Sequence, residues 1–402
     1  YIALLEKKGF TEHAEVFVDG TKIESKANKY TFVWLKQVLK QLEKVKGKLK
    51  ELIAPEGNLT LSKVGAKLEK LNSEIISQGI EVKKGRGHHK PEIVRKRDQI
   101  EELRHRWIEY EKKKAICGEK RNSYSKTDPD ATFMHMKDDH MNNSQLKPGY
   151  NVQFAVNSGF VTGIGVFSDR TDFGTLIPLL SYMQRKHGQK YEKVVADSGY
   201  ESEENYLFIE DNQQIAFIKP GNYEISKTRK YKTDISRREN MTYDEEQDIY
   251  ICKNNKQLKV TGVKRSRSKT GYVSEKTCYS CEDCKDCPYK TSCIKGNNSK
   301  IPMEERSKHL EVSKTFQKKR AEDLERILSE EGCRLRMNRS IQAEGSFADT
   351  KEDMSFRRYL CRGERNVLAE STLVAIAHNI NKLHNKIQSG KTGQHLFELK
   401  TA

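Results

Sequence analysis

The chain has 402 residues, enough for two or three structural units, and with 35% hydrophobic and 33% charged residues it can bury a modest core. Its 74 Lys and Arg against 57 Asp and Glu give a formal net charge of +17, which predicts a polyanionic partner such as nucleic acid. A ribosomal-type or merely soluble basic protein is the alternative. No apolar run approaches the roughly 20 residues that cross a bilayer, and no secretory leader is recognisable. We therefore expect a cytoplasmic protein without a membrane partner.

The first predicted strand carries an acidic residue. Residues 15–23 alternate apolar and polar side chains, which favours a strand, and Asp19 lies within it directly before a glycine. Acidic residues are unfavourable in strands, so Asp19 is a candidate functional residue. The chain begins at Tyr1, and residues 1–10 already have the pattern of a helix, so we expect the sequence to be truncated at its N-terminus.

Residues 31–120 are predicted to form a helical hairpin or short coiled coil. Apolar residues recur every three or four positions between 38 and 52 and again between 61 and 75, with a Pro–Gly break between the two runs. A third helix follows a basic loop at residues 83–90, which is either a contact to a DNA backbone or a solvated linker. The apolar seam can close within one chain or form a dimer surface.

Residues 121–221 have the pattern of an α/β unit, because strand-like runs at 151–156, 161–167, 191–197 and 215–218 alternate with helix-like runs at 172–187 and 202–211. Asp197 ends one of these strands, where ligands collect in open α/β sheets. Residues 222–310 are polar, basic and rich in cysteine, which indicates an insertion. Residues 311–402 return to helices, one of which carries Glu344.

Asp19, Asp197 and Glu344 are candidates for a shared carboxylate site. Converging carboxylates repel one another unless a cation lies between them, and Mg²⁺ prefers carboxylate oxygens. Two such ions can activate the attacking oxygen and stabilise the leaving oxygen during displacement at phosphorus. Because the chain has 57 acids, any three could be chosen, so the sequence around these three is the stronger evidence for a shared site.

Four segments strongly resemble bacterial insertion-sequence transposases: VFVDGTKIESKANKY (16–30), SYSKTDPDATFMHMKDDHMNNSQLKPGYNVQFAV (123–156), VVADSGYESEENY (194–206) and RSIQAEGSFADTKEDMSFRRYLCRGERNVLAE (339–370). The resemblance covers nearly the whole chain in the correct order. It implies an α/β fold, namely an RNase H-like mixed sheet with flanking helices, interrupted by a helical hairpin insertion (31–120) and a Cys-rich insertion (222–310). The first core strand would lie in residues 1–30, the core in 121–221 and the completing helices in 311–402.

The resemblance also implies a DDE transposase, which hydrolyses phosphodiester bonds and transfers strands at insertion-sequence ends. Its cofactor would be Mg²⁺, bound as two ions and replaceable by Mn²⁺. Its partner would be double-stranded DNA, comprising the terminal inverted repeats and the target, with a homodimer assembled on that DNA. Family members usually begin with an additional helical DNA-recognition region, in agreement with the expected truncation.

The same resemblance implies the site residues. Asp19, Asp197 and Glu344 would be the catalytic, metal-holding acids. Part of the group carries a Tyr-x2-Arg-x3-Glu-x6-Lys signature: here Glu344 and Lys351 match, whereas Arg339 lies one position too far from Glu344 and Met337 occupies the place of the Tyr. The candidate DNA contacts are Arg339, Lys351, Arg357 and Arg358.

Five closely spaced cysteines indicate a metal site in the insertion. Their pattern, Cys278-x2-Cys281-x2-Cys284-x2-Cys287-x5-Cys293, allows neighbouring thiolates to share one tetrahedral Zn²⁺. The expected ligands are Cys281, Cys284, Cys287 and Cys293, with Cys278 or Cys252 as substitutes. An iron–sulfur cluster and unligated thiols are the alternatives.

Two other functions fit these features. One is a non-catalytic DNA-binding or assembly remnant of a transposase. The other is an RNase H-like nuclease without joining activity, which shares the acidic site and differs only in its products.

Overall fold

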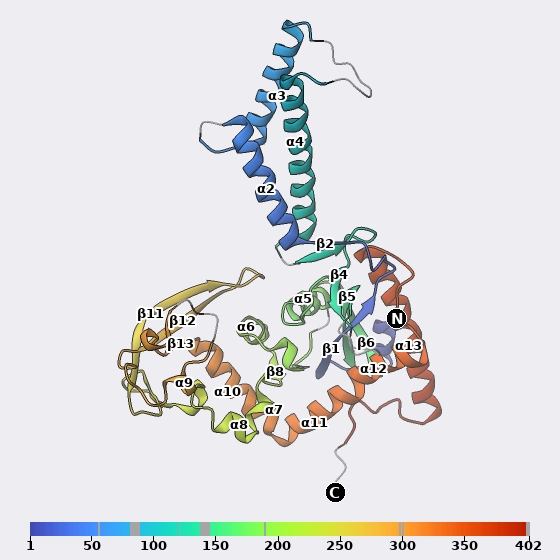
Figure 1. The fold of residues 1–402 in the computed structure, drawn as a ribbon. Coiled ribbons are helices and arrows are strands. Elements are labelled where there is room, and N and C mark those ends of the chain that lie inside the picture. Colours follow the sequence, from blue (N-terminus) through green and yellow to red (C-terminus); the bar gives the residue numbers. More distant parts are fainter. Residues whose placement is uncertain are drawn as a thin grey trace.

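A six-stranded mixed sheet forms the centre of the protein, whose computed structural model describes residues 1–54, 57–80, 89–119, 121–136, 145–188, 190–296, 299 and 301–398 (Figure 1). Its strands are β1 (Glu15–Glu24), β4 (Thr132–His135), β5 (Leu146–Asn157), β6 (Phe160–Phe167), β7 (Lys193–Ala196) and β8 (Ile215–Ile218). The order is β4-β5-β1-β7-β8, and β6 also pairs with β5. Strand β1 is antiparallel to β5 and parallel to β7, which is parallel to β8, so the predicted α/β class is confirmed.

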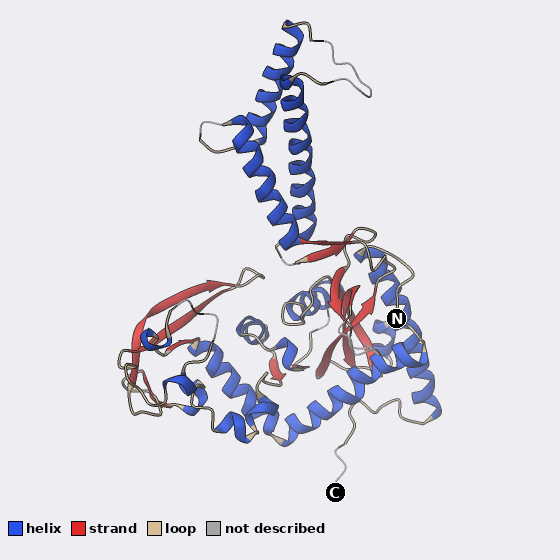
Figure 2. Cartoon of the chain, viewed as in Figure 1, coloured by secondary structure: helices blue, strands red, loops and turns tan. Residues whose placement is uncertain are grey.

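Helices cover both faces of this sheet (Figure 2). The helices α5 (Leu176–His187) and α6 (Glu203–Asp211) pack on one face, and α10 (Lys314–Leu328), α11 (Glu330–Arg339) and α13 (Glu364–Gln388) cover the other. The sheet has a hydrophobic core on each face, and alternate residues of β1 pack into different cores. Val16 and Val18 pack on the α5–α6 side, and Phe17 packs on the side of the C-terminal helices. Asp19 shares the parity of Phe17, so its side chain points toward the C-terminal helices.

The helical segment that carries Glu344 contains two π-helical turns. After α11 come η4 (Ser340–Glu344, π), α12 (Gly345–Ala348) and η5 (Asp349–Asp353, π). Phe347 stacks on Phe154 of β5 with a centroid distance of 4.3 Å, which fixes this segment against the sheet. π-Turns are rare and occur often at functional sites, and Glu344 is the last residue of the first of these two turns.

A helical arm projects from the body of the protein (Figure 1). It consists of α2 (Leu35–Ile53), α3 (Leu61–Ser77) and α4 (Glu92–Cys117), and the short strands β2 (Phe32–Trp34) and β3 (Ser123–Ser125) pair at its base. Leucines and valines of α2 and α3 pack against Ile100, Leu103 and Trp107 of α4. The apolar seam therefore closes within one chain. Most of the basic loop at residues 83–90 lies outside the described residues.

The cysteine-bearing segment forms a second, five-stranded antiparallel sheet in the order β13-β12-β11-β10-β9. Its strands are β9 (Thr242–Asp244), β10 (Ile249–Ile251), β11 (Gln257–Arg267), β12 (Val273–Cys281) and β13 (His309–Val312). Short helices complete it, namely α7 (Tyr223–Ser226), α8 (Arg229–Lys232), η2 (Arg238–Asn240), α9 (Lys290–Cys293) and η3 (Met303–Glu305). The sequence pattern did not predict these strands, because most of β11 is exposed on both faces and shows no apolar alternation.

The remaining elements are the N-terminal helix α1 (Ile2–Lys7) and η1 (Ser198–Tyr200), a single turn after β7. Among the helices that the structure describes, none combines the length and the apolar character that a membrane span requires.

Candidate active site

Asp19 and Asp197 are brought side by side by the register of two parallel strands. Val18 of β1 pairs with Ala196, the last residue of β7, so the next residue along each chain is an aspartate. Neighbouring strands lie about 4.8 Å apart, which brings the two carboxylates together. Asp19 is 6% exposed, whereas Asp197 caps η1 by accepting the Gly199 N–H at 2.7 Å. Asp19 is therefore fixed inside the sheet, and Asp197 is fixed just beyond the C-terminal end of β7.

Arg339 connects Asp19 to Glu344, the third acid. Its Nη1 lies 3.7 Å from Asp19 Oδ1, and its Nη2 lies 2.6 Å from Glu344 Oε1. The second Glu344 oxygen accepts a hydrogen bond from Ser340 Oγ at 2.9 Å. The side chain of Glu344 is 49% exposed, whereas that of Arg339 is 15% exposed. Glu344 thus lies within one guanidinium group of Asp19 while remaining open to solvent.

A fourth acid, Asp172, lies beside Asp197 and was not singled out in the sequence. Its Oδ1 accepts hydrogen bonds from Asn151 Nδ2 at 2.6 Å and from Gln153 Nε2 at 3.0 Å. A Cβ atom added to Gly199 would meet both Asp197 Oδ1 at 3.0 Å and Asp172 Oδ2 at 3.2 Å. Asp172 precedes α5 and lies in no strand or motif. The one sequence signal for its position is the polar pair Asn151 and Gln153, which interrupts the apolar run of residues 150–156.

The buried Tyr200 reports the charge of this neighbourhood. Its hydroxyl donates a hydrogen bond to Gln153 Oε1. Burial raises the pKa of Tyr200 well above its ordinary value, the charges of Asp172, Asp19 and Asp197 raise it further, and Arg339 opposes them. Three aspartates and one arginine therefore lie near enough to act on one phenol, so these charged groups are neighbours in the fold.

The donors suit a hard divalent cation, since Mg²⁺ prefers carboxylate oxygens. In the described parts of the chain, however, no three His, Cys, Asp or Glu side chains are already arranged to hold a metal ion. The guanidinium of Arg339 supplies the positive charge between Asp19 and Glu344 instead. A cation shared by these two acids would require Arg339 to withdraw or Glu344 to change rotamer.

The four candidate DNA contacts differ in exposure. Arg339 pairs with Asp19 and Glu344, and Lys351 is only 7% exposed. Arg357 pairs with Glu352, and Arg358, 55% exposed, reaches the carbonyl of Ser25 at 3.3 Å. Of the four, Arg358 is thus the most open to solvent.

Four cysteines predicted as zinc ligands, Cys281, Cys284, Cys287 and Cys293, line one small cavity together with Cys252. Cys278 is not part of the wall of this cavity: it lies in β12, where its Sγ is 3.9 Å from the carbonyl of Lys276. The structure thus separates the two substitutes that the sequence left open, bringing Cys252 to the cluster and leaving Cys278 outside it.

Comparison with known proteins finds one similar family. Residues 251–384 match the model of a family described as "Transposase DDE domain". This match indicates a DDE-type transposase domain in that part of the chain. Transposases of this kind process nucleic acid and normally use divalent metal ions. The matched stretch contains Glu344 and the clustered cysteines, whereas Asp19 and Asp197 lie before it. No curated protein and no solved structure matches this chain.

Proposed function

We propose that this protein is a DDE transposase that hydrolyses a phosphodiester bond at each end of an insertion sequence and joins the freed 3′-hydroxyl to target DNA. The observation that carries the proposal is the convergence of the three acids. The strand register aligns Asp19 with Asp197, and Arg339 bridges Asp19 and Glu344. The central strand has antiparallel neighbours on one side and parallel neighbours on the other, which is compatible with an RNase H-like core.

The residues of this site have separable roles in the proposal. Asp19 offers a carboxylate that the sheet holds rigid, and Asp197 offers one that the Gly199 N–H holds at the strand end. Glu344 is half exposed and can change rotamer, so it completes the site. Two Mg²⁺ ions, replaceable by Mn²⁺, would activate the attacking oxygen and stabilise the leaving oxygen when bound. Asn151 and Gln153 hold Asp172 beside Asp197, where it adds negative charge to the site.

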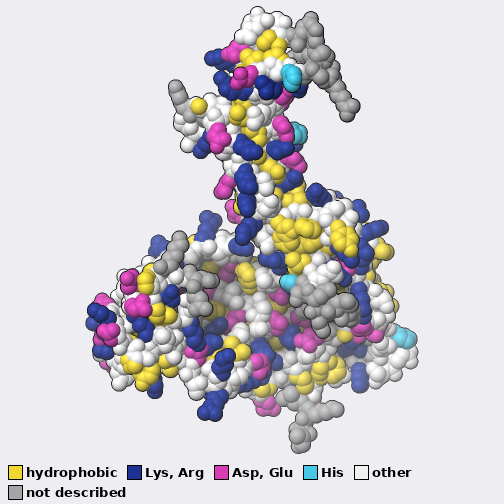
Figure 3. Space-filling view, viewed as in Figure 1, with side chains coloured by type: hydrophobic (Ala, Val, Ile, Leu, Met, Phe, Trp, Pro, Cys, Tyr) yellow, Lys and Arg dark blue, Asp and Glu magenta, His cyan; other side chains and the backbone are white. Residues whose placement is uncertain are grey.

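The surface of the protein suits a DNA substrate. Figure 3 shows the molecule hollowed between the Cys-rich insertion and the sheet, with acidic side chains inside the hollow and Lys and Arg side chains around its edge and along the arm. With a net charge of +17, such a surface attracts the DNA backbone. Double-stranded terminal repeats and target DNA are the proposed substrates, bound by a homodimer.

The test replaces Asp197 with Asn. Asn is nearly isosteric and also caps helices well, so the fold should persist while one carboxylate is lost. We expect nicking and strand transfer to fall to background in the presence of Mg²⁺, with DNA binding in a gel-shift assay unchanged. The matched control is Asp211→Asn, at the exposed end of α6, which should keep full activity.

Each alternative has its own outcome in this assay. Full activity of Asp197→Asn would eliminate the proposed site. A wild-type chain that nicks DNA without joining it is a nuclease, and one that binds DNA without cutting it is a non-catalytic remnant.

A further inference from the structure

The five cysteines that line one cavity come from three separate segments of the insertion. Cys252 follows β10, Cys281 ends β12, Cys284 and Cys287 lie in the next loop, and Cys293 ends α9. The cavity has a volume of about 20 Å³, room for roughly one water-sized particle. This space suits a single ion.

The five thiols differ in burial. Cys281 is 2% exposed at the end of its strand and is hydrogen-bonded to Cys284, so it is the most deeply buried of the five. Cys252, Cys287 and Cys293 are each partly exposed, and Cys284 is 8% exposed. The four thiols other than Cys281 are therefore the more accessible to an incoming ion.

Two of these cysteines lie at tight turns of the backbone. The N–H of Cys252 donates to the carbonyl of Lys256 at 3.0 Å, and Asn255 inside this turn has a φ of 54°. Asp286, directly before Cys287, also has a positive φ of 54°. The backbone N–H of Lys308 donates to Cys284 Sγ at 3.4 Å, a contact that stabilises a negatively charged sulfur.

The wall of the cavity also carries compensating positive charge. Lys253, Lys256, Lys290 and Lys308 line it together with the cysteines. Lys290 is only 9% exposed, and its ammonium donates to the Glu304 carbonyl. Lys308 Nζ donates to the carbonyls of Ser236 at 2.7 Å and Cys293 at 3.2 Å. Largely buried ammonium groups bonded to carbonyls gain from a nearby anion, and four thiolates around a divalent ion carry two negative charges.

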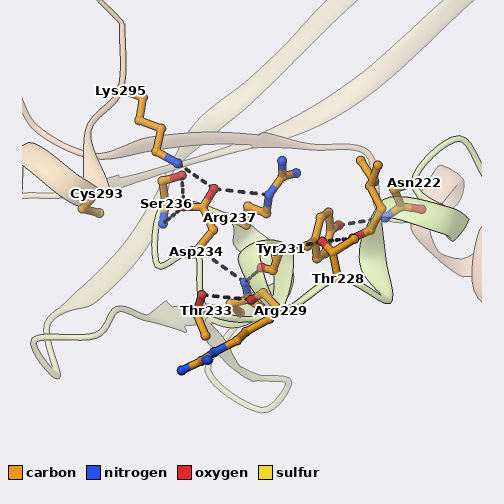
Figure 4. Close-up of polar contacts among 12 residues, drawn as sticks. Asn222, Thr228, Arg229, Tyr231, Thr233, Asp234, Ser236, Arg237, Cys293 and Lys295 are labelled. Carbon is orange, nitrogen blue, oxygen red and sulfur yellow. Dashed lines mark hydrogen bonds and ion pairs between the residues drawn. The ribbon is translucent and has the colours of Figure 1, made fainter.

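A polar network beside the cavity wall is held independently of any ion. Ile235 lines the cavity, and its neighbour Asp234 accepts hydrogen bonds from Ser236 and Lys295 and pairs with Arg237 at 3.4 Å (Figure 4). The Ser236 hydroxyl and the Lys295 ammonium each lie 2.6 Å from an Asp234 oxygen, and Lys295 follows Cys293 by two residues. This network anchors α9 to the segment after α8.

We propose that the insertion holds one structural Zn²⁺ on the thiolates of Cys252, Cys284, Cys287 and Cys293. The described side chains do not yet form a metal-binding group, so each cysteine must rotate about χ1 until its sulfur lies about 2.3 Å from the ion. Each thiol that binds releases its proton. The module has a small apolar core, centred on Met241, Tyr250, Leu258, Tyr279 and Val312, and the ion would add the folding free energy that this core lacks.

The test measures metal content in the full chain, purified without chelator and reconstituted with Zn²⁺. We expect one tightly bound zinc per chain after gel filtration, near-complete loss of it in Cys252→Ser, and retention in Cys278→Ser and Cys281→Ser. Loss of zinc from Cys281→Ser together with retention in Cys252→Ser would overturn the ligand set. A wild-type chain that keeps no zinc, or that holds iron and acid-labile sulfide, would overturn the site.

A second measurement covers the case in which Cys252→Ser does not fold. The wild-type chain with Co²⁺ in place of Zn²⁺ should show the intense sulfur-to-metal charge-transfer bands of four thiolates, and Cys278→Ser should show the same bands. Cobalt bound by the carboxylates of the active site gives no such bands, so failure of the zinc site and failure of the proposed catalytic site are distinguishable. Absence of these bands would contradict the proposal.

Discussion

At the scale of single residues, Arg339 supplies the positive charge of the candidate active site in the metal-free protein. Its guanidinium lies between Asp19 and Glu344, so the acids have a counter-charge before any metal binds. Its Nη1 is buried without a hydrogen-bond partner among the described residues, 3.7 Å from Asp19 Oδ1. Because Nη1 lacks a hydrogen bond within the described part of the chain, a divalent ion can displace this guanidinium more easily than it could displace one whose nitrogens were all hydrogen-bonded.

We predict that Arg339→Gln destabilises the metal-free protein by about 1–3 kcal/mol, because two acids lose their charged partner. The measurement is urea unfolding in the presence of EDTA. Mg²⁺ should recover more stability in this variant than in the wild type, since it replaces the missing charge. The control is Arg265→Gln, whose side chain is 77% exposed and whose partner Glu275 is 58% exposed, and it should change stability by less than about 0.5 kcal/mol. Equal losses in the two variants would contradict the role of Arg339.

Asp323 in α10 predicts a pH dependence of stability. It is fully buried, accepts hydrogen bonds from the Ile218 N–H at 3.0 Å and Tyr206 Oη at 3.3 Å, and lies 3.6 Å from Arg326. Burial raises the pKa of Asp323 to about 7 despite the opposing charge of Arg326. The folded state therefore holds a proton that the unfolded state has lost, and this contribution to stability decreases as pH rises from about 4 to about 7.

We predict that Asp323→Asn removes this slope, which for one group is at most about 1.4 kcal/mol per pH unit. The asparagine oxygen can still accept from Ile218 and Tyr206 without carrying a charge. The measurement is the free energy of unfolding in urea at several pH values between 4 and 8. Identical slopes in the variant and the wild type would show that Asp323 is ionised in both states.

At the scale of elements, the junction of α10 and α11 positions the helix that carries Arg339 and Glu344. Ser329 separates the two helices and caps the second by accepting the Gly332 N–H at 3.1 Å. A Cβ atom on Gly332 would lie 2.1 Å from the Arg326 carbonyl oxygen and 2.6 Å from Ile327 Cα. Both contacts are to backbone, so the junction cannot adapt by moving a side chain.

We predict that Gly332→Ala destabilises the protein by about 1–3 kcal/mol, because the helices must separate to admit the methyl group. Gly345→Ala is the matched control: its added Cβ would meet nothing within 4 Å, so it should be neutral or stabilise by up to about 1 kcal/mol. Urea unfolding measures both. A Gly332→Ala variant as stable as Gly345→Ala would contradict the close packing at this junction.

At the scale of the whole molecule, the arm is an almost separate structure. Its apolar residues form their own cluster, and a second small cluster of Val33, Val38, Cys117 and Tyr124 joins its base to the body. Lys46 Nζ lies 3.2 Å from Glu111 Oε1, so α2 and α4 run side by side near these residues. Shortening the arm there leaves the base cluster in place.

We predict that replacing residues 44–112 with a short Gly–Ser linker leaves the remaining body folded. The urea midpoint of the body should stay within error of the wild type, because the sheet and its helices form a different core. Limited proteolysis should show the same resistant fragments outside the arm. Loss of cooperative unfolding would show that the arm contributes to the core.

The sequence by itself determined the resemblance to DDE transposases, the α/β class, the helices of the arm and the acids worth examining, because periodicity and short motifs are local properties of the chain. It could not give the partners of those acids. Asp172 joins Asp197 through strand packing, and Arg339 lies between Asp19 and Glu344 because α11 continues into a π-turn against the sheet. Likewise Cys252 reaches the other cysteines only because β10 pairs with β11. Such contacts join residues far apart in sequence, so only the tertiary structure decided them.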